Sequence, residues 1–253
     1  DRIGILGMTP QDVSDLDAAD KIRDLYQQKY GKQAVCYCMG DGLEEIREAS
    51  SVSRNIVVSP AALMTAKYLE KTFGTPYEIH YPLVDELVRD MDYQGKKVLV
   101  VQQQVTGNAI REEILKKAPD AQVTVASWFM MKPELRRDED LHLRDEEDYI
   151  KLVETGSYDV IYADPCMARM TPKFEGVFVD TVHFAVSGKL VTVEAAKDSK
   201  ELKEPGKQKK KKKTREVKEP GKQGGHDHCD YDRMNPLDRK STRLNSSHYF
   251  EKR

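Results

Sequence analysis

Residues 55–76 read NIVVSPAALMTAKYLEKTFGTP, and this stretch decides the fold class. The apolar run Ile56–Val58 has the length and composition of a buried strand. It ends at Ser59-Pro60, and apolar residues then recur with the 3.6-residue period of a helix until Gly74. A strand that leads directly into a helix is the repeating unit of α/β folds with parallel sheets. In such folds ligands bind at the carboxyl ends of the strands, so the junction is also a candidate site.

Ser59 stands at this junction. Serine is favoured at the N-cap of a helix, and proline is favoured directly after it. The chain has no GxSxG motif, which is the usual context of a nucleophilic serine at a strand–helix turn. We therefore predict that Ser59 caps the helix that follows it.

Strand and helix patterns alternate through the first 192 residues. The predicted strands lie at 3–6, 34–38, 56–58, 77–80, 98–101, 123–127, 160–163 and 177–179, and the longer predicted helices at 16–30, 60–73, 106–117 and 145–155. Ser14 or Asp15 is the predicted cap of the first helix, which should end at Gly31. Gly107, in VTGNA at 105–109, should lie at a strand–helix turn, which is only a weak indication of an anion site.

The alternation restarts after the polar sequence QGKK at 94–97. Short strands separated by helices predict parallel sheets built from βαβ units. The fold class that we predict is α/β, with two Rossmann-like three-layer domains at 1–92 and 93–192. The charged segment 134–148 should form a solvated loop and the acidic start of a helix.

The sequence changes in character after these domains. Residues 193–253 carry 18 Lys and Arg against 11 Asp and Glu, include Lys209–Lys213, and repeat KEPGKQ at 203–208 and 218–223. Such sequence has too few apolar residues to bury, so 193–237 is predicted to be a disordered Lys-rich linker or tail. Residues 238–248, DRKSTRLNSSH, resemble a translated sequencing adapter, which makes 238–253 a predicted artefact; the alternative is a genuine basic tail. Because the chain also opens without Met, we expect the native protein to extend beyond both ends.

The charge of the first 192 residues is net acidic, with 23 Lys and Arg against 32 Asp and Glu. An acidic body argues against a nucleic-acid groove. The sequence also has no apolar stretch of the ~20 residues that a transmembrane helix needs, and no signal peptide. Four cysteines without paired spacing are typical of a reducing compartment. We predict a cytoplasmic protein that binds neither nucleic acid nor membranes.

Thiol and imidazole side chains follow several predicted strands. Cys36 and Cys38 share a face of one strand, Cys166 follows the strand at 160–163, and His183 follows the last strand. Each residue alone is more often structural than a ligand. Together, at the carboxyl ends of strands, they would suit a metallocofactor or redox ligand. In the tail, His226, His228 and Cys229 are further candidates for binding metal, with adventitious binding as the alternative.

The amino-acid sequence of the chain resembles that of nitrogenase component 1 and its relatives. The matching stretches are IGILGMTPQD at 3–12, GDGLEEI at 40–46, the stretch from 55 to 88 with LEKTFGTPY, GKKVLVVQQ at 95–103, YDVIYADP at 158–165 and VHFAVSG at 182–188. The resemblance covers roughly 2–190, which corresponds to the second and third of the family's three Rossmann-like domains. The family's cysteine-rich first domain, which holds an iron–sulfur cluster, has no counterpart here.

This resemblance implies an oxidoreductase subunit that receives low-potential electrons from an ATP-dependent iron–sulfur reductase and reduces a bound substrate or cofactor. It also implies a homologous second subunit as partner. Ser59 matches the family's cofactor-ligating Cys, and His183 lies near its cofactor-ligating His. A hydroxyl is a poor ligand for soft metals, so we expect the substrate not to be dinitrogen. Two alternatives remain, a non-catalytic scaffold for cofactor assembly and a subunit of a tetrapyrrole reductase.

The cofactor expected for the full-length family protein is an iron–sulfur cluster or metallocofactor. The cofactor-binding candidates are Ser59, His183, Cys38 and Cys166. Because an iron–sulfur cluster generally needs four thiolates or a defined replacement, we predict that this fragment holds none by itself.

Overall fold

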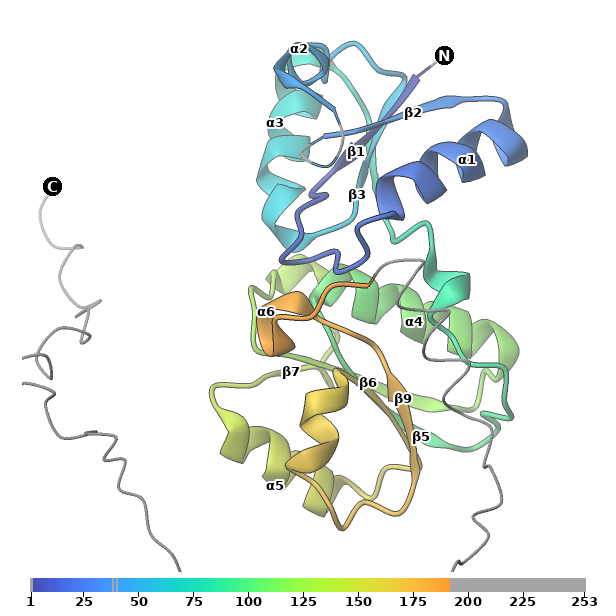
Figure 1. Ribbon diagram of the computed structural model, residues 1–253, viewed down its shortest axis with the longest axis vertical. Coiled ribbons are helices and arrows are strands. Elements are labelled where there is room, and N and C mark those ends of the chain that lie inside the picture. Colours follow the sequence, from blue (N-terminus) through green and yellow to red (C-terminus); the bar gives the residue numbers. More distant parts are fainter. Residues whose placement is uncertain (1, 38, 40, 192–253) are drawn as a thin grey trace, which may run out of the picture. The chain divides into compact units, whose positions relative to one another are not determined.

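The computed structural model describes residues 2–37, 39 and 41–191 (Figure 1). Cys38, His226, His228 and Cys229, together with the predicted tail and adapter-like segment, lie outside the described residues. No helix in the described part of the chain is long and apolar enough to cross a lipid bilayer.

The chain forms two parallel sheets, as predicted. The first has the order β2-β1-β3-β4 and the second the order β7-β6-β5-β8-β9. Their strands are β1 (Arg2–Leu6), β2 (Gln33–Cys36), β3 (Arg54–Val57), β4 (Tyr77–Ile79), β5 (Lys97–Val101), β6 (Gln122–Ser127), β7 (Leu141–His142), β8 (Val160–Ala163) and β9 (Val177–Asp180). The two-residue strand β7 is too short to be found from periodicity, and the sequence did not predict it.

Helices follow most of the strands, as βαβ units require. The α-helices are α1 (Ala18–Tyr30), α2 (Leu43–Arg47), α3 (Leu63–Phe73), α4 (Gln104–Lys117), α5 (Glu146–Gly156) and α6 (Phe184–Ser187). Four short 3-10 helices are described with them, η1 (Pro60–Ala62), η2 (Val84–Glu86), η3 (Pro133–Leu135) and η4 (Pro165–Arg169). The helices α1 and α3 end at Gly31 and Gly74, as predicted.

Alternate residues of the strands face opposite helices, which gives each sheet three layers. In the first sheet, Ile3 and Ile5 pack with α1, and Leu6 and Val57 pack with α3. In the second sheet, Val98 and Val100 pack with α4. On the other face, Leu99, Val101 and Ile161 pack with α5. Both sheets are therefore covered on both faces, which is why their strands read as continuous apolar runs.

The two cores touch each other. Ala109 of α4 packs with the core of the first sheet, and Val84 and Leu87 pack against the cores of both sheets. The sequence predicted a boundary near 94–97 because the pattern restarts there, and that pattern gives no information on contacts between the two cores. The exact domain boundaries stay a prediction.

Three local predictions were wrong. Gly107 lies inside α4 and not at a turn; it is buried where an added Cβ would lie 2.6 Å from the Cγ1 of Val125. The helix α1 begins at Ala18, and Ser14 instead accepts a hydrogen bond from the backbone of Phe184 at 2.8 Å. The segment 134–148 does lead into the acidic start of α5, as predicted, but its loop is not wholly solvated, because Asp140 is fully buried.

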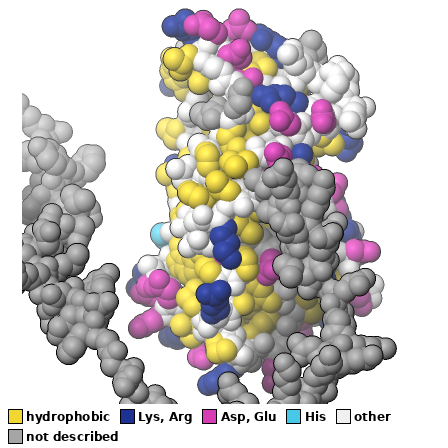
Figure 2. Space-filling model, viewed as in Figure 1, with side chains coloured by type: hydrophobic (Ala, Val, Ile, Leu, Met, Phe, Trp, Pro, Cys, Tyr) yellow, Lys and Arg dark blue, Asp and Glu magenta, His cyan; other side chains and the backbone are white. Residues whose placement is uncertain are grey.

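The surface of the described residues is mixed in character. Apolar side chains lie between charged ones on the face drawn in Figure 2. The helix α3 contributes the exposed side chains of Met64, Tyr68 and Phe73. Single exposed apolar residues are normal on protein surfaces, so these alone do not identify a partner.

Candidate functional site

Buried polar side chains gather just after the strands, at their carboxyl ends. The members that follow a strand directly or by a few residues are Ser59, Gln102, Gln103, Gln104, Asp164, Thr181 and His183. They come from β3 of the first sheet and from β5, β8 and β9 of the second. Because a buried polar group needs a partner, each of them is either part of a structural network or available to a ligand.

Ser59 caps the short helix η1, as predicted. Its Oγ accepts a hydrogen bond from the backbone N–H of Ala61 at 3.2 Å and donates one to Oδ2 of Asp12 at 2.6 Å. The side chain is fully buried. Gly7 lies against it with φ of +93°, where a Cβ would come within 2.9 Å of the serine Cβ. The Ser59 hydroxyl thus uses its only donor and one acceptor lone pair to hold the loop after β1 against the start of η1.

Asp164 is the centre of the site in the second sheet. Its carboxylate accepts hydrogen bonds from the backbone N–H of Cys166 and of His183, each at 2.9 Å, and from Oγ of Ser187 at 2.6 Å. Burial raises the pKa of this carboxyl, and these hydrogen bonds outweigh that effect and lower the pKa below its ordinary value. One carboxylate thus fixes the positions of two predicted site residues, Cys166 and His183.

His183 is the least satisfied polar side chain of the site. It is 2% exposed, its ring stacks on Phe129 with centroids 4.4 Å apart and planes at 11°, and neither ring nitrogen has a hydrogen-bond partner among the described residues. Burial lowers the pKa of the imidazole, against the opposing effects of Asp12 and Asp164. A neutral imidazole offers one nitrogen as acceptor and one as donor. The ring is consequently the group of this site that is most available to a ligand.

Gln103 joins the two sheets beside Ser59. Nε2 of Gln103 donates to the carbonyl of Val58 at 2.8 Å and to Oγ1 of Thr106 at 2.6 Å, while its Oε1 accepts from the backbone of Val105 and caps α4. Sequence reasoning missed this residue and also Asp12. The available signal was the run of three glutamines directly after the apolar strand at 98–101, which is unusual for a helix start.

The described cysteines do not gather into a metal site. Cys36 is buried in β2 with its thiol against the carbonyl of Ala19, and burial raises its pKa to about 12. Burial, and after it Asp164, raises the pKa of Cys166 to about 11. Metals bind the thiolate, which these environments disfavour. Among residues 2–37, 39 and 41–191 no three His, Cys, Asp or Glu side chains are placed to hold a metal ion.

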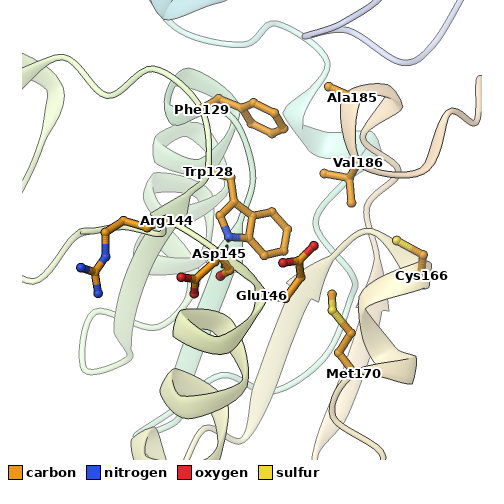
Figure 3. A pocket seen from close by; sticks show the side chains of 9 residues that line it. All are labelled: Trp128, Phe129, Arg144, Asp145, Glu146, Cys166, Met170, Ala185 and Val186. Atoms are coloured by element: carbon orange, nitrogen blue, oxygen red, sulfur yellow. Dashed lines mark hydrogen bonds between the residues drawn. The ribbon is translucent and has the colours of Figure 1, made fainter. Parts of the chain in front are cut away.

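A cavity of about 430 Å³ opens next to Cys166 (Figure 3). Its lining residues are Trp128, Phe129, Arg144, Asp145, Glu146, Cys166, Met170, Ala185 and Val186. Phe129 contributes to this cavity and also stacks on His183. The cavity therefore adjoins the His183 site through one aromatic ring, although neither His183 nor Ser59 lines it.

The architecture matches a known structure. A solved structure of nitrogenase Cp1 at pH 6.5 aligns with a TM-score of 0.50 and 13% identity, over 71% of this chain and 52% of that one. The fold is nitrogenase-like. This chain spans about half the length of the nitrogenase chain that it matches.

The other comparisons add no information on the fold or family of this protein. D-lactate dehydrogenase with NAD+ from Lactobacillus jensenii aligns with a TM-score of 0.20 and 8% identity, over 64% of this chain and 62% of that one, which is too low a score to bear on the fold. No protein-family model matches the sequence, and no curated protein is significantly similar to it. The likeness to nitrogenase Cp1 at 13% identity shows the fold alone.

The resemblance noted in the sequence implies a metallocofactor, and the described residues do not fit one held by thiolates. Position 59 has a hydroxyl that is already used in two hydrogen bonds, Cys36 points into a core, and Cys166 is a single thiol with a raised pKa. An iron–sulfur cluster needs about four such ligands. The roles of Ser59, His183, Cys38 and Cys166 in binding a cofactor remain predictions.

Proposed function

We propose that this chain is part of a nitrogenase component 1-like oxidoreductase subunit that holds its substrate or cofactor through His183. The observation that carries the proposal is the buried imidazole whose two nitrogens have no partner among the described residues. Leaving such a group unpaired costs about 1–3 kcal/mol of stability. A ligand that bonds to the ring would remove this cost.

The serine at position 59 argues against dinitrogen as the substrate. Its hydroxyl is a hard donor, and both of its hydrogen bonds hold the protein's own loops. The ligand in this proposal is therefore one that needs no thiolate from this position. An ATP-dependent iron–sulfur reductase would supply the low-potential electrons one at a time, as the resemblance implies. A homologous second subunit would complete the assembly.

The residues around the ring have separate tasks in this proposal. Asp164 sets the backbone of His183, and Phe129 fixes the plane of the imidazole. Asp12 and Asp164 favour the protonated ring, while burial favours the neutral ring. This balance lets His183 bind a ligand as a neutral base near pH 7 and accept a proton at lower pH.

The test measures electron transfer. The full chain is mixed anaerobically with a reduced nitrogenase-type iron–sulfur reductase, Mg-ATP and a tetrapyrrole as the electron acceptor, and the oxidation of the reductase is followed by its visible absorption. We expect the wild-type chain to accelerate this oxidation and His183→Ala to abolish at least about 90% of the acceleration. His142→Ala, which changes an exposed histidine of β7, should behave as wild type.

The outcomes separate the proposal from its rivals. A chain that binds the reductase but does not accelerate its oxidation would be a scaffold, which contradicts the catalytic proposal. Equal activity of the wild type and His183→Ala would show that the imidazole does not hold the ligand. Circular dichroism of both variants confirms that the fold is retained.

A further inference from the structure

The cavity next to Cys166 is lined by apolar and aromatic side chains on one part of its wall and by charged side chains on another. Trp128 and Phe129 follow β6, Met170 and Cys166 belong to the region of η4, and Val186 lies on α6. Figure 3 shows the indole of Trp128 between Phe129 on one side and Met170 on the other. A volume of about 430 Å³ is within the range of small-molecule sites, which is roughly 300–1,000 Å³.

The polar edge of the tryptophan is already used. Its Nε1 donates to the carbonyl of Asp145 at 3.2 Å, and its ring packs edge-on against Tyr149 at 5.9 Å. The indole is thereby held in place, and a face of the ring remains for a ligand. The face of an indole attracts cations more strongly than the ring of Tyr or Phe does.

The charge of the cavity lining is net negative, with the carboxylates of Asp145 and Glu146 against the guanidinium of Arg144. In the part of the chain that the structure describes, no cation pairs with Glu146, whose carboxylate lies beside the indole in Figure 3. The only cation in the lining, Arg144, points away and is bound to Asp148 by two hydrogen bonds at 2.9 and 3.0 Å. Arg169 and Lys189 act on the Cys166 thiol from outside the lining.

We propose that this cavity binds a small organic cation of the quaternary or tertiary ammonium class. The indole face of Trp128 and the carboxylate of Glu146 would hold the charged head, and Phe129, Met170 and Val186 would contact its alkyl groups. An inorganic cation does not fit, because metal ions such as Ca²⁺ and Mg²⁺ require several oxygen ligands. An anion does not fit, because Asp145 and Glu146 would repel it. This site is additional to the one at His183, and it does not depend on electron transfer.

Trp128 makes the proposal easy to test, because it is the only tryptophan of the 253 residues. Choline is titrated into the full chain while tryptophan fluorescence is recorded, and 3,3-dimethylbutan-1-ol serves as the neutral probe of the same shape. We expect a saturable change with choline and at least about tenfold weaker binding of the alcohol. The variant Glu146→Gln should weaken choline about fivefold or more and leave the alcohol unchanged.

The matched control is Glu147→Gln, which removes the neighbouring exposed carboxylate that does not line the cavity. It should leave the affinity for choline within about twofold of the wild type. No saturable change with choline would overturn the proposal. Equal binding of choline and the alcohol would also overturn it, because it would indicate an apolar site without charge selection. Equal losses of choline affinity in the two variants would do the same, because they would indicate general electrostatics. Isothermal calorimetry repeats the comparison without relying on fluorescence.

Discussion

At the scale of single residues, Asp164 organises the site through its backbone contacts. Two of its three hydrogen bonds come from backbone N–H groups, those of Cys166 and His183, and the third comes from Ser187. The sequence places Asp164 at the end of a strand but gives no indication that segments 19 residues apart meet on one carboxylate. Asp164 is accordingly a positioning residue for His183.

The pKa of Asp164 leads to a prediction about pH. Burial raises the pKa, but the hydrogen bonds from Ser187, His183 and Cys166 together lower it by more than burial raises it. The folded-state pKa is therefore below the unfolded value of about 3.9. The stability that this group contributes is therefore present above pH ~4 and is lost as the pH falls through the folded-state pKa. Asp164→Asn should lower the free energy of unfolding at pH 7 by about 1–3 kcal/mol and flatten its decline below pH 4.

Urea unfolding at pH 7 and at steps down to pH 3 measures both effects. Asp180→Asn, at the exposed end of β9, is the matched control and should change little. If Asp164→Asn kept the full acid-dependent decline, the proposed hydrogen-bonded carboxylate would not be its source.

At the scale of elements, a buried ion pair anchors the long segment between β6 and β7. The guanidinium of Arg111 on α4 contacts the carboxylate of Asp140 at 2.5 and 3.1 Å, and both side chains are buried. Asp140 also accepts from the backbone of Val125 at 3.1 Å and of Arg137 at 2.9 Å. Since this segment begins with Trp128 and Phe129, the pair also supports the walls of the cavity.

Breaking this pair should be costly. Asp140→Ala leaves the charge of Arg111 buried without its partner, so we expect the free energy of unfolding to fall by about 3–5 kcal/mol. Glu139→Ala removes a half-exposed carboxylate 3.8 Å from the same guanidinium and should cost less than about 1 kcal/mol. Denaturant unfolding of both variants measures the difference. Similar losses in the two would mean that Asp140 has no special role.

At the scale of the whole molecule, the two sheets are joined by contacts on several elements. Gln103 binds the carbonyl of Val58, the backbone of Val191 pairs with that of Ser14 and Leu16, and Ala109 enters the first core. The Val191 contacts link the chain after β9 to the chain before α1, and the other two join α4 to the first sheet. Such a joined core favours unfolding as one cooperative unit.

This coupling gives a prediction that also tests the role of the tail. By calorimetry, the chain shortened to residues 1–192 should show a single transition, with a midpoint within a few degrees of that of the full chain. The reason is that 193–253 is rich in charged residues and has few apolar residues to bury. Two separate transitions would show that 1–92 and 93–192 unfold independently, and a large fall in the midpoint would show that the tail supports the fold.

The sequence by itself determined the strands other than β7, the main helices and the fold class, because periodicity and capping act over a few residues. The apolar runs at 56–58 and 98–101, the cap at Ser59 and the helix end at Gly74 all follow from such local rules. They also placed Ser59, Cys166 and His183 correctly after strands.

Only the tertiary structure decided what these side chains contact. The bond of Ser59 to Asp12 joins residues 47 positions apart, and the contacts of Arg111 with Asp140 and of Gln103 with Val58 are also long-range. It likewise showed that Gly107 packs against Val125 instead of forming a turn, and that both nitrogens of His183 are left without a partner among the described residues. Burial depends on which segments meet, and no local pattern carries that information, because the free energy of a buried polar group is set by its neighbours in space.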